Sequence, residues 1–153
     1  MMINFIYLVL ATVFSTPALA NSSFNLGGTP NEVQLEVGNL QKDAELIGMS
    51  REKIRAAAEA KLHSLKIRTS ADGKKPAVVV KVTTIDVGPR LASYVQIEFK
   101  ELARLLRRPG PAASFVTSWS KAKMVASEPT KHEAQVIRAS EELIQDFLRA
   151  SLE

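Results

Sequence analysis

The sequence predicts an α+β domain with the element order β-α-β-β-β-α, in which a four-stranded mixed sheet carries two helices on one face. Three patterns predict this class. Residues 32–37 alternate apolar and polar side chains, residues 77–87 are rich in β-branched side chains, and residues 130–148 carry an apolar stripe at helical spacing.

Residues 1–20 have the pattern of an export signal. They carry no charged side chain, are apolar over residues 5–14, and end on the small-x-small triplet Ala18-Leu19-Ala20. The apolar run is shorter than the roughly 20 residues that a membrane span needs. We therefore expect cleavage after Ala20 and a soluble periplasmic or secreted protein. A retained N-terminal anchor or a buried first helix is the alternative.

Composition narrows the chemistry that this chain can perform. The sequence contains no cysteine, so it offers no disulfide, no thiol chemistry and no attachment point for a lipoprotein anchor. Hydrophobic residues make up 46% and charged residues 24%, the balance of an ordinary globular domain, and the net charge is +4. That mild excess favours an anionic partner slightly.

The domain is expected to span residues 31–153, after a polar, glycine-rich lead at 21–30 (NSSFNLGGTP). Residues 32–37 predict its first strand. Ser50 is a natural N-cap for the first helix, with Met49 and Ile54 spaced as a hydrophobic staple. This helix should end near Leu65, and Ile67 could begin an extended segment.

Three extended segments are expected next. Residues 77–87 (AVVVKVTTIDV) are apolar on both faces, which indicates a central strand that ends at Gly88-Pro89. Residues 91–105 alternate at first, and the pattern changes phase near Lys100-Glu101. A strand with a bulge there explains the change, and a helix over residues 100–106 is the alternative.

The partner strand of this predicted hairpin is residues 113–125. Strand alternation places Phe115, Thr117 and Trp119 on one face of it. Trp119 is the chain's one tryptophan, and we interpret it as a core residue, with ligand stacking as the alternative.

The last helix is expected to begin at a capping box formed by Thr130 and Glu133. Its apolar stripe consists of Val136, Ile137, Ser140, Leu143, Ile144, Phe147 and Leu148. His132 in the first turn is interpreted as a surface residue. Glu141, Glu142 and Asp146 are expected on the solvated face.

Several blocks of this sequence resemble a family of small exported bacterial proteins of uncharacterised function. The blocks are residues 46–54 with Ala58, Glu59 and Leu62, then residues 94–99, 117–119 and 144–148 with Leu152. The resemblance spans about Val33 to Leu152 and lends no catalytic residue. The element order also resembles the periplasmic domain of envelope-assembly lipoproteins, such as the lipopolysaccharide-transport partner of the outer membrane, although the lipidation cysteine is missing here.

Catalytic and metal-binding motifs are missing from the sequence. Glu59 and His63 lie four residues apart and can meet on one helix face, but two ligands do not make a transition-metal site and no HExxH motif adds a third. There is no GxSxG nucleophile elbow and no glycine-rich phosphate loop. We expect no metal, no cofactor and no enzymatic activity. A hydrolase of unknown type is the alternative.

The concentrated charge of the chain lies in the basic segment, residues 100–123, which holds six Lys or Arg residues and one acid. Its candidate contacts for an anionic partner are Arg104, Arg107, Arg108, Lys121 and Lys123. Pro109-Gly110 is expected at the hairpin tip. Export makes nucleic acid an improbable partner, which leaves lipid headgroups, lipopolysaccharide or an acidic protein surface. The simpler interpretation is that the charges keep an exposed strand edge from pairing with other chains.

Two functions follow from these expectations. The first is a non-enzymatic protein-interaction module of the cell envelope, with an envelope protein as its partner. The second is a binder of anionic lipid or lipopolysaccharide through the basic hairpin.

Overall fold

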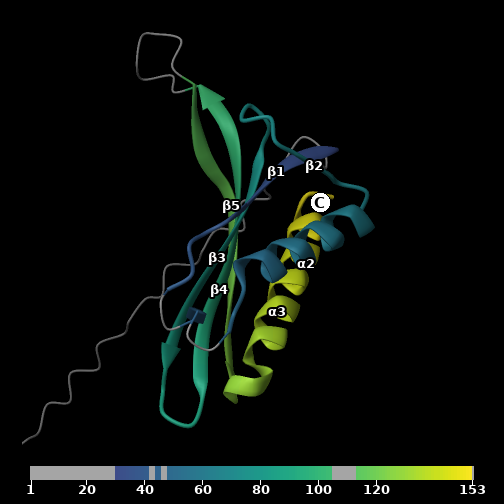
Figure 1. Cartoon of the computed structure of the whole chain (residues 1–153). Helices are drawn as coiled ribbons and strands as arrows, with labels where there is room; N and C mark the ends of the chain where they lie inside the picture. The colour runs from purple at the N-terminus through teal and green to yellow at the C-terminus, as the bar shows by residue number, and fades with distance from the viewer. Residues whose placement is uncertain (1–29, 42–43, 46–47, 105–112, 153) are drawn as a thin grey trace, which may run out of the picture.

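A computed structural model describes residues 30–41, 44–45, 48–104 and 113–152 of the chain. The elements are β1 (Glu32–Val37), α2 (Arg51–Ser64), β2 (Arg68–Ser70), β3 (Ala77–Asp86), β4 (Leu91–Arg104), β5 (Ala113–Ser127) and α3 (Pro129–Ala150). Both helices lie on the same side of the sheet (Figure 1). The predicted α+β class is therefore confirmed.

The sheet has five strands in the order β2-β1-β3-β4-β5, so the prediction of four strands was wrong. The additional strand, β2, has only three residues and pairs in parallel with β1, from Arg68 opposite Glu32 to Ser70 opposite Gln34. It lies in the extended segment that could begin at Ile67, but three residues are too few to show an alternation that predicts a strand of the sheet. β3 lies between β1 and β4, as its apolar sequence predicts.

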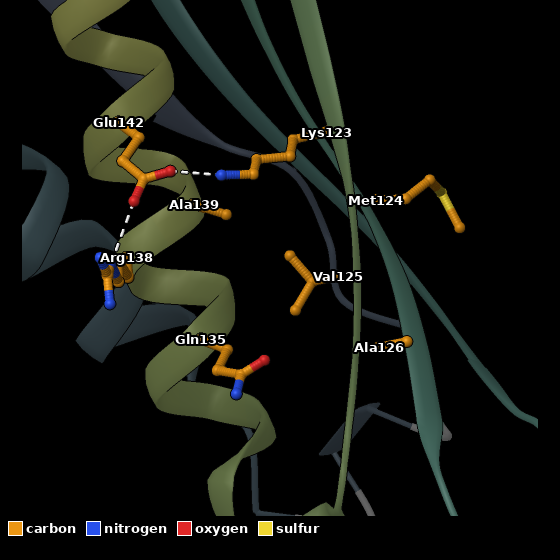
Figure 2. Close-up of a pocket in the computed structure, with 8 residues that line it drawn as sticks. All are labelled: Lys123, Met124, Val125, Ala126, Gln135, Arg138, Ala139 and Glu142. Atoms are coloured by element: carbon orange, nitrogen blue, oxygen red, sulfur yellow. Dashed lines mark hydrogen bonds and ion pairs between the residues drawn. The ribbon is translucent and has the colours of Figure 1, made fainter.

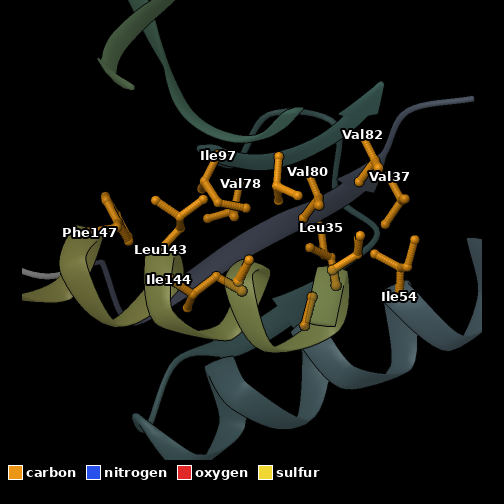
Figure 3. Packing of buried hydrophobic residues seen from close by; sticks show 14 of the residues in the cluster. Leu35, Val37, Ile54, Val78, Val80, Val82, Ile97, Leu143, Ile144 and Phe147 are labelled. Atoms are coloured by element: carbon orange, nitrogen blue, oxygen red, sulfur yellow. The ribbon is translucent and has the colours of Figure 1, made fainter. Parts of the chain in front are cut away.

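The core fills the space between the sheet and the two helices (Figure 3). Val78, Val80 and Val82 of β3 face this side of the sheet, and the stripe of α3 meets them through Leu143 and Ile144. Strand alternation puts every second residue of β3 against the helices. The helical spacing of α3 does the same for its stripe.

The first helix begins as predicted. The Ser50 side chain accepts a hydrogen bond from the Lys53 backbone N–H at 3.3 Å, which is an N-cap contact. The backbone N–H of Ser50 donates to Glu133 Oε2 at 3.0 Å, and Lys53 Nζ donates to Glu133 Oε1 at 2.8 Å. A carboxylate of α3 therefore caps the start of α2.

The prediction that Thr130 and Glu133 form a capping box at the start of α3 was wrong, because Glu133 caps α2 instead. Helix α3 begins at Pro129 after the N-cap residue Glu128, and Glu133 is engaged by α2 instead of by its own helix. Burial acts to raise the pKa of Glu133, but the hydrogen bonds from Lys53 and Ser50 outweigh it and lower that pKa. The ionised carboxylate thus joins the two helices.

The Glu133→Ala change should lower the free energy of unfolding by about 1.5 kcal/mol, because the half-buried Ser50 N–H loses its charged acceptor. Urea unfolding followed by circular dichroism would measure this loss. Glu128→Ala is the matched control, since Glu128 forms an exposed ion pair with Lys131 and should contribute less than about 0.5 kcal/mol. Equal losses in the two variants would contradict this role of Glu133.

The predicted strand is confirmed as far as Arg104, which excludes the helical alternative over residues 100–104, and a bulge does interrupt the register at Lys100, but the extra residue is not in this strand as predicted. Phe99 pairs with Trp119, whereas the next residue, Lys100, pairs with Thr117. The extra residue is therefore Ser118 of β5, whose hydroxyl donates to the Phe99 carbonyl at 3.4 Å.

This bulge changes which side chains of β5 share a face. Phe99 and Lys100 are consecutive and point to opposite faces, so Trp119 and Thr117, their partners, do so too. The prediction that Phe115 and Thr117 share the face of Trp119 was wrong. Trp119 packs against the core, as expected, with its ring centroid 5.4 Å from that of Phe147 in an edge-to-face arrangement.

Candidate interaction surface

An open groove lies between the free edge of β5 and helix α3 (Figure 2). It has a volume of about 460 Å³. Val125 of β5 and Ala139 of α3 are buried and point toward one another across it, while Met124 points to the other face of the sheet. The full lining is Lys123, Met124, Val125, Ala126, Gln135, Arg138, Ala139 and Glu142. The groove thus has an apolar floor and a polar rim.

The rim is held by ion pairs between the strand and the helix. Lys123 pairs with Glu142, which also accepts from Arg138 Nε at 3.0 Å. Lys121 Nζ lies 2.8 Å from Asp146 Oδ2. The hydrogen bonds from Lys123 and then from Arg138 lower the pKa of Glu142. Glu142 therefore stays ionised and holds α3 beside β5.

A signal for these pairs is present in the sequence. Two residues along a strand cover about 6.7 Å, and four residues along a helix cover about 6 Å. Lys121 and Lys123 therefore match the spacing of Asp146 and Glu142. The helical pattern alone predicts both acids on a solvated face, because nothing local to α3 indicates that β5 lies beside it.

A smaller hollow, of about 210 Å³, continues the groove toward the start of α3. Arg90, Glu128 and Lys131 line it together with Ala126, Ser127 and Gln135. Ala126 and Gln135 also belong to the groove, so the two form one surface along β5. Lys131 pairs with Glu128 at 3.2 Å. Arg90 forms no ion pair with any residue that the structure describes.

The five candidate contacts of the basic segment have different surroundings. Lys121 and Lys123 are paired with carboxylates of α3 and do not form a free cationic cluster. The backbone of Arg104 pairs with that of Ala113 at the end of the β4–β5 hairpin. Arg107 and Arg108 lie outside the described residues, as does the predicted tip at Pro109-Gly110.

The outer end of this hairpin projects beyond the rest of the sheet (Figure 1). Leu102 and Phe115 are directly opposite in its register and therefore share a face. They are 50% and 40% exposed. Two large apolar side chains thus stand in solvent beside the strand end that carries Arg104.

A polar cluster lies inside the domain, at the opposite end of β4. His132 is fully buried, with its Nε2 2.7 Å from Ser93 Oγ and its Nδ1 2.8 Å from Ser127 Oγ. Thr84 Oγ1 lies 2.7 Å from Ser93 Oγ and extends the chain of hydrogen bonds. The prediction that His132 is a surface residue was wrong. Its position four residues before Val136 places it on the buried stripe of α3.

This cluster contains a serine–histidine contact but not an accessible one. Ser93 and His132 are both fully buried, so a substrate cannot reach the hydroxyl without local opening. Burial lowers the pKa of His132 and favours the neutral imidazole. A neutral ring that has a hydroxyl at each nitrogen satisfies both of its hydrogen-bonding atoms. The cluster is therefore a satisfied part of the core.

Glu59 and His63 come together through a third residue. Thr69 of β2 donates to Glu59 Oε1 at 2.7 Å, and its hydroxyl lies 3.3 Å from His63 Nε2. His63 is exposed. Within the described part of the chain, no three His, Cys, Asp or Glu residues are grouped as metal ligands would be.

Comparison with known proteins assigns no family to this chain. No protein-family model matches the sequence, and no curated protein matches it. Among solved structures, the fold is similar to a crystal structure of a minor lipoprotein from Acinetobacter baumannii, with 12% sequence identity and a TM-score of 0.42. The match covers 80% of this chain and 90% of the lipoprotein chain. In the part of the chain that the structure describes, no helix has the length and apolar character to cross a membrane.

Proposed function

We propose that this protein is a non-enzymatic interaction module of the bacterial cell envelope, periplasmic or secreted after cleavage near Ala20. The observation that carries the proposal is the groove along β5, where a buried apolar floor at Val125 and Ala139 and a polar rim lie beside a strand edge. A strand edge presents unpaired backbone groups and is a natural place for a second chain to bind. The export pattern of residues 1–20 supports the location.

Purification of the tagged protein from periplasmic extract tests this function. We expect one envelope protein to co-purify in near-stoichiometric amount. When that partner carries the tag instead, we expect the present protein to co-purify with it. Washing at low and high salt would show how far charge contributes. A periplasmic extract that yields no stoichiometric partner under either condition would contradict the proposal.

A second candidate function, binding of anionic lipid or lipopolysaccharide, is favoured by the exposed pair Leu102 and Phe115 beside Arg104. Exposed apolar side chains next to basic ones suit a surface that meets lipid headgroups, where each Lys or Arg adds about 1 kcal/mol of attraction. Arg107 and Arg108 would add to this charge. Lys121 and Lys123 would contribute less, because each already pairs with a carboxylate of α3.

Flotation with vesicles that contain phosphatidylglycerol or lipopolysaccharide tests this second function. Changing Arg104, Arg107 and Arg108 to Glu should abolish binding. The control changes Arg51, Arg55 and Lys74 to Glu; these residues are exposed and lie far along the chain, and the change in net charge is the same. Binding that survives the first set of changes, or that is lost equally in both, would exclude a lipid site at the hairpin.

A further inference from the structure

We propose that the groove between β5 and α3 receives an extended acidic segment of a partner protein, which joins the sheet as an additional strand beside β5. This inference rests on the proposed interaction function and names the chemistry of the partner. It concerns residues 121–128 of β5, residues 131–142 of α3, and Arg90.

The outer edge of β5 is open. β5 is the last strand of the sheet, and in the described residues it pairs with β4 alone. Alternate residues of an edge strand direct their N–H and C=O groups away from the sheet. Lys123, Met124 and Ala126 are exposed along this stretch. An extended chain can therefore reach the free backbone groups.

The groove beside that edge has a shape that suits an added strand. Side chains of an added strand would point alternately toward α3 and toward the outer face of the sheet. Those that point toward α3 would lie over Val125 and Ala139, where the small alanine leaves room. Those that point outward would lie beside Met124. The inward positions of the segment should therefore be apolar and of moderate size.

The charge around the groove is predominantly positive. Four cations surround the combined groove, namely Arg90, Lys123, Lys131 and Arg138, against the two carboxylates of Glu128 and Glu142. Glu142 is shared by two of the cations, and Arg90 lacks a carboxylate partner among the described residues. The first turn of α3 contains no acidic side chain, and the helix dipole adds positive potential there. Carboxylates on the incoming segment complement this excess.

The edge lysines Lys121 and Lys123, which are half exposed and only partly neutralised by their partners on α3, disfavour a second copy of this chain as the occupant. Antiparallel pairing of two β5 edges would bring the lysines at 121 and 123 of one copy near those of the other. Like charges on neighbouring strands are destabilising, and lysines on an edge are a common device against such pairing. An acidic segment removes this repulsion.

Titration of the isotope-labelled protein with defined peptides, followed by amide chemical shifts, tests the inference. The probe is an acetylated, amidated peptide that alternates Glu and Val. One comparison peptide replaces Glu by Lys, and another carries N-methyl groups on alternate residues, which removes the strand-pairing donors. We expect the acidic peptide alone to bind, with shifts confined to residues 121–128, residues 131–142 and Arg90.

Charge-reversal variants supply the second measurement. Arg90→Glu combined with Lys131→Glu should weaken binding of the acidic peptide at least about tenfold. Both residues are exposed and lie outside the β5–α3 ion pairs, so the fold should remain intact. Arg55→Glu on α2 is the control and should bind like the wild type.

Four results would overturn the inference: no binding of the acidic peptide, equal binding of the Lys peptide, equal binding of the N-methylated peptide, or a dimer through β5 in sedimentation. An envelope partner that co-purifies equally with the Arg90→Glu, Lys131→Glu protein would leave the interaction function standing and remove the groove as its site. Peptide binding in the groove without any co-purifying envelope partner would support the groove as a peptide site and contradict the proposed interaction function.

Discussion

Phe147→Ala should lower the free energy of unfolding by about 3–5 kcal/mol, the range for removing a fully buried phenylalanine. Phe147 is 0% exposed, and its ring packs against two other rings, with its centroid 4.7 Å from that of Phe99 and 5.4 Å from that of Trp119. The change removes both contacts and leaves a cavity where α3 meets β4 and β5. Such a loss is a large part of the stability of a domain of this size.

Thermal and urea unfolding, followed by circular dichroism, measure the effect of this change. Phe115→Ala is the matched control, because Phe115 is the same residue type on β5 but is 40% exposed and stands outside the core. It should change the free energy of unfolding by less than about 0.5 kcal/mol. A small loss for Phe147→Ala, or equal losses for the two variants, would contradict the packing described here.

The second large effect is expected at His132. His132→Ala leaves the Ser93 and Ser127 hydroxyls without their shared partner inside the core. Each unsatisfied buried polar group costs about 1–3 kcal/mol, so we expect a total loss of about 3 kcal/mol. His63→Ala is the control, since His63 is exposed, and it should be nearly neutral. If the two histidine variants unfold at the same urea concentration, the buried cluster does not stabilise the fold.

Burial of His132 should also make the free energy of unfolding depend on pH. Burial lowers the pKa of His132 in the folded chain below its unfolded value of about 6.5. As the pH falls through about 6.5, the unfolded chain binds a proton that the folded chain does not. The free energy of unfolding therefore decreases from there down to the folded pKa, and this histidine has no such effect at higher pH.

Unfolding of the wild type and of His132→Gln between about pH 7 and about pH 5 checks this sign. The variant should have the flatter profile. Glu133 and Glu142 have lowered pKa values and titrate below this window, so they do not obscure the comparison. Parallel profiles would show that His132 takes up its proton equally in the folded and unfolded chains.

Much of the fold could be predicted because its signals are local. The alternation of residues 32–37, the N-cap Ser50 and the phase change near Lys100 are each visible within a few residues, and the structure confirms all three. The bulge occurs in the pair of strands where it was predicted, but the extra residue is Ser118 of β5 and not a residue of β4. The sequence of β4 alone cannot show which of two paired strands carries the extra residue.

The candidate site was less predictable. The basic segment was singled out for its charge density, and that pattern cannot show that Lys121 and Lys123 pair with Asp146 and Glu142. The groove has no motif of its own, because its floor is a valine from one element and an alanine from another. Only the position of α3 beside β5 brings Val125 and Ala139 together.

The sequence by itself determined the α+β class, the order of every element except β2, and the apolar stripe of α3, because strand and helix periodicities are properties of neighbouring residues. Only the tertiary structure showed the fifth strand, the hydrogen bond from the start of α2 to Glu133, the partners of His132 and the groove. These contacts join residues far apart in the chain: Ser50 and Glu133 are 83 positions apart, and Ser93 and His132 are 39. Contacts of that range arise only when the packing of the helices on the sheet fixes the geometry of both partners.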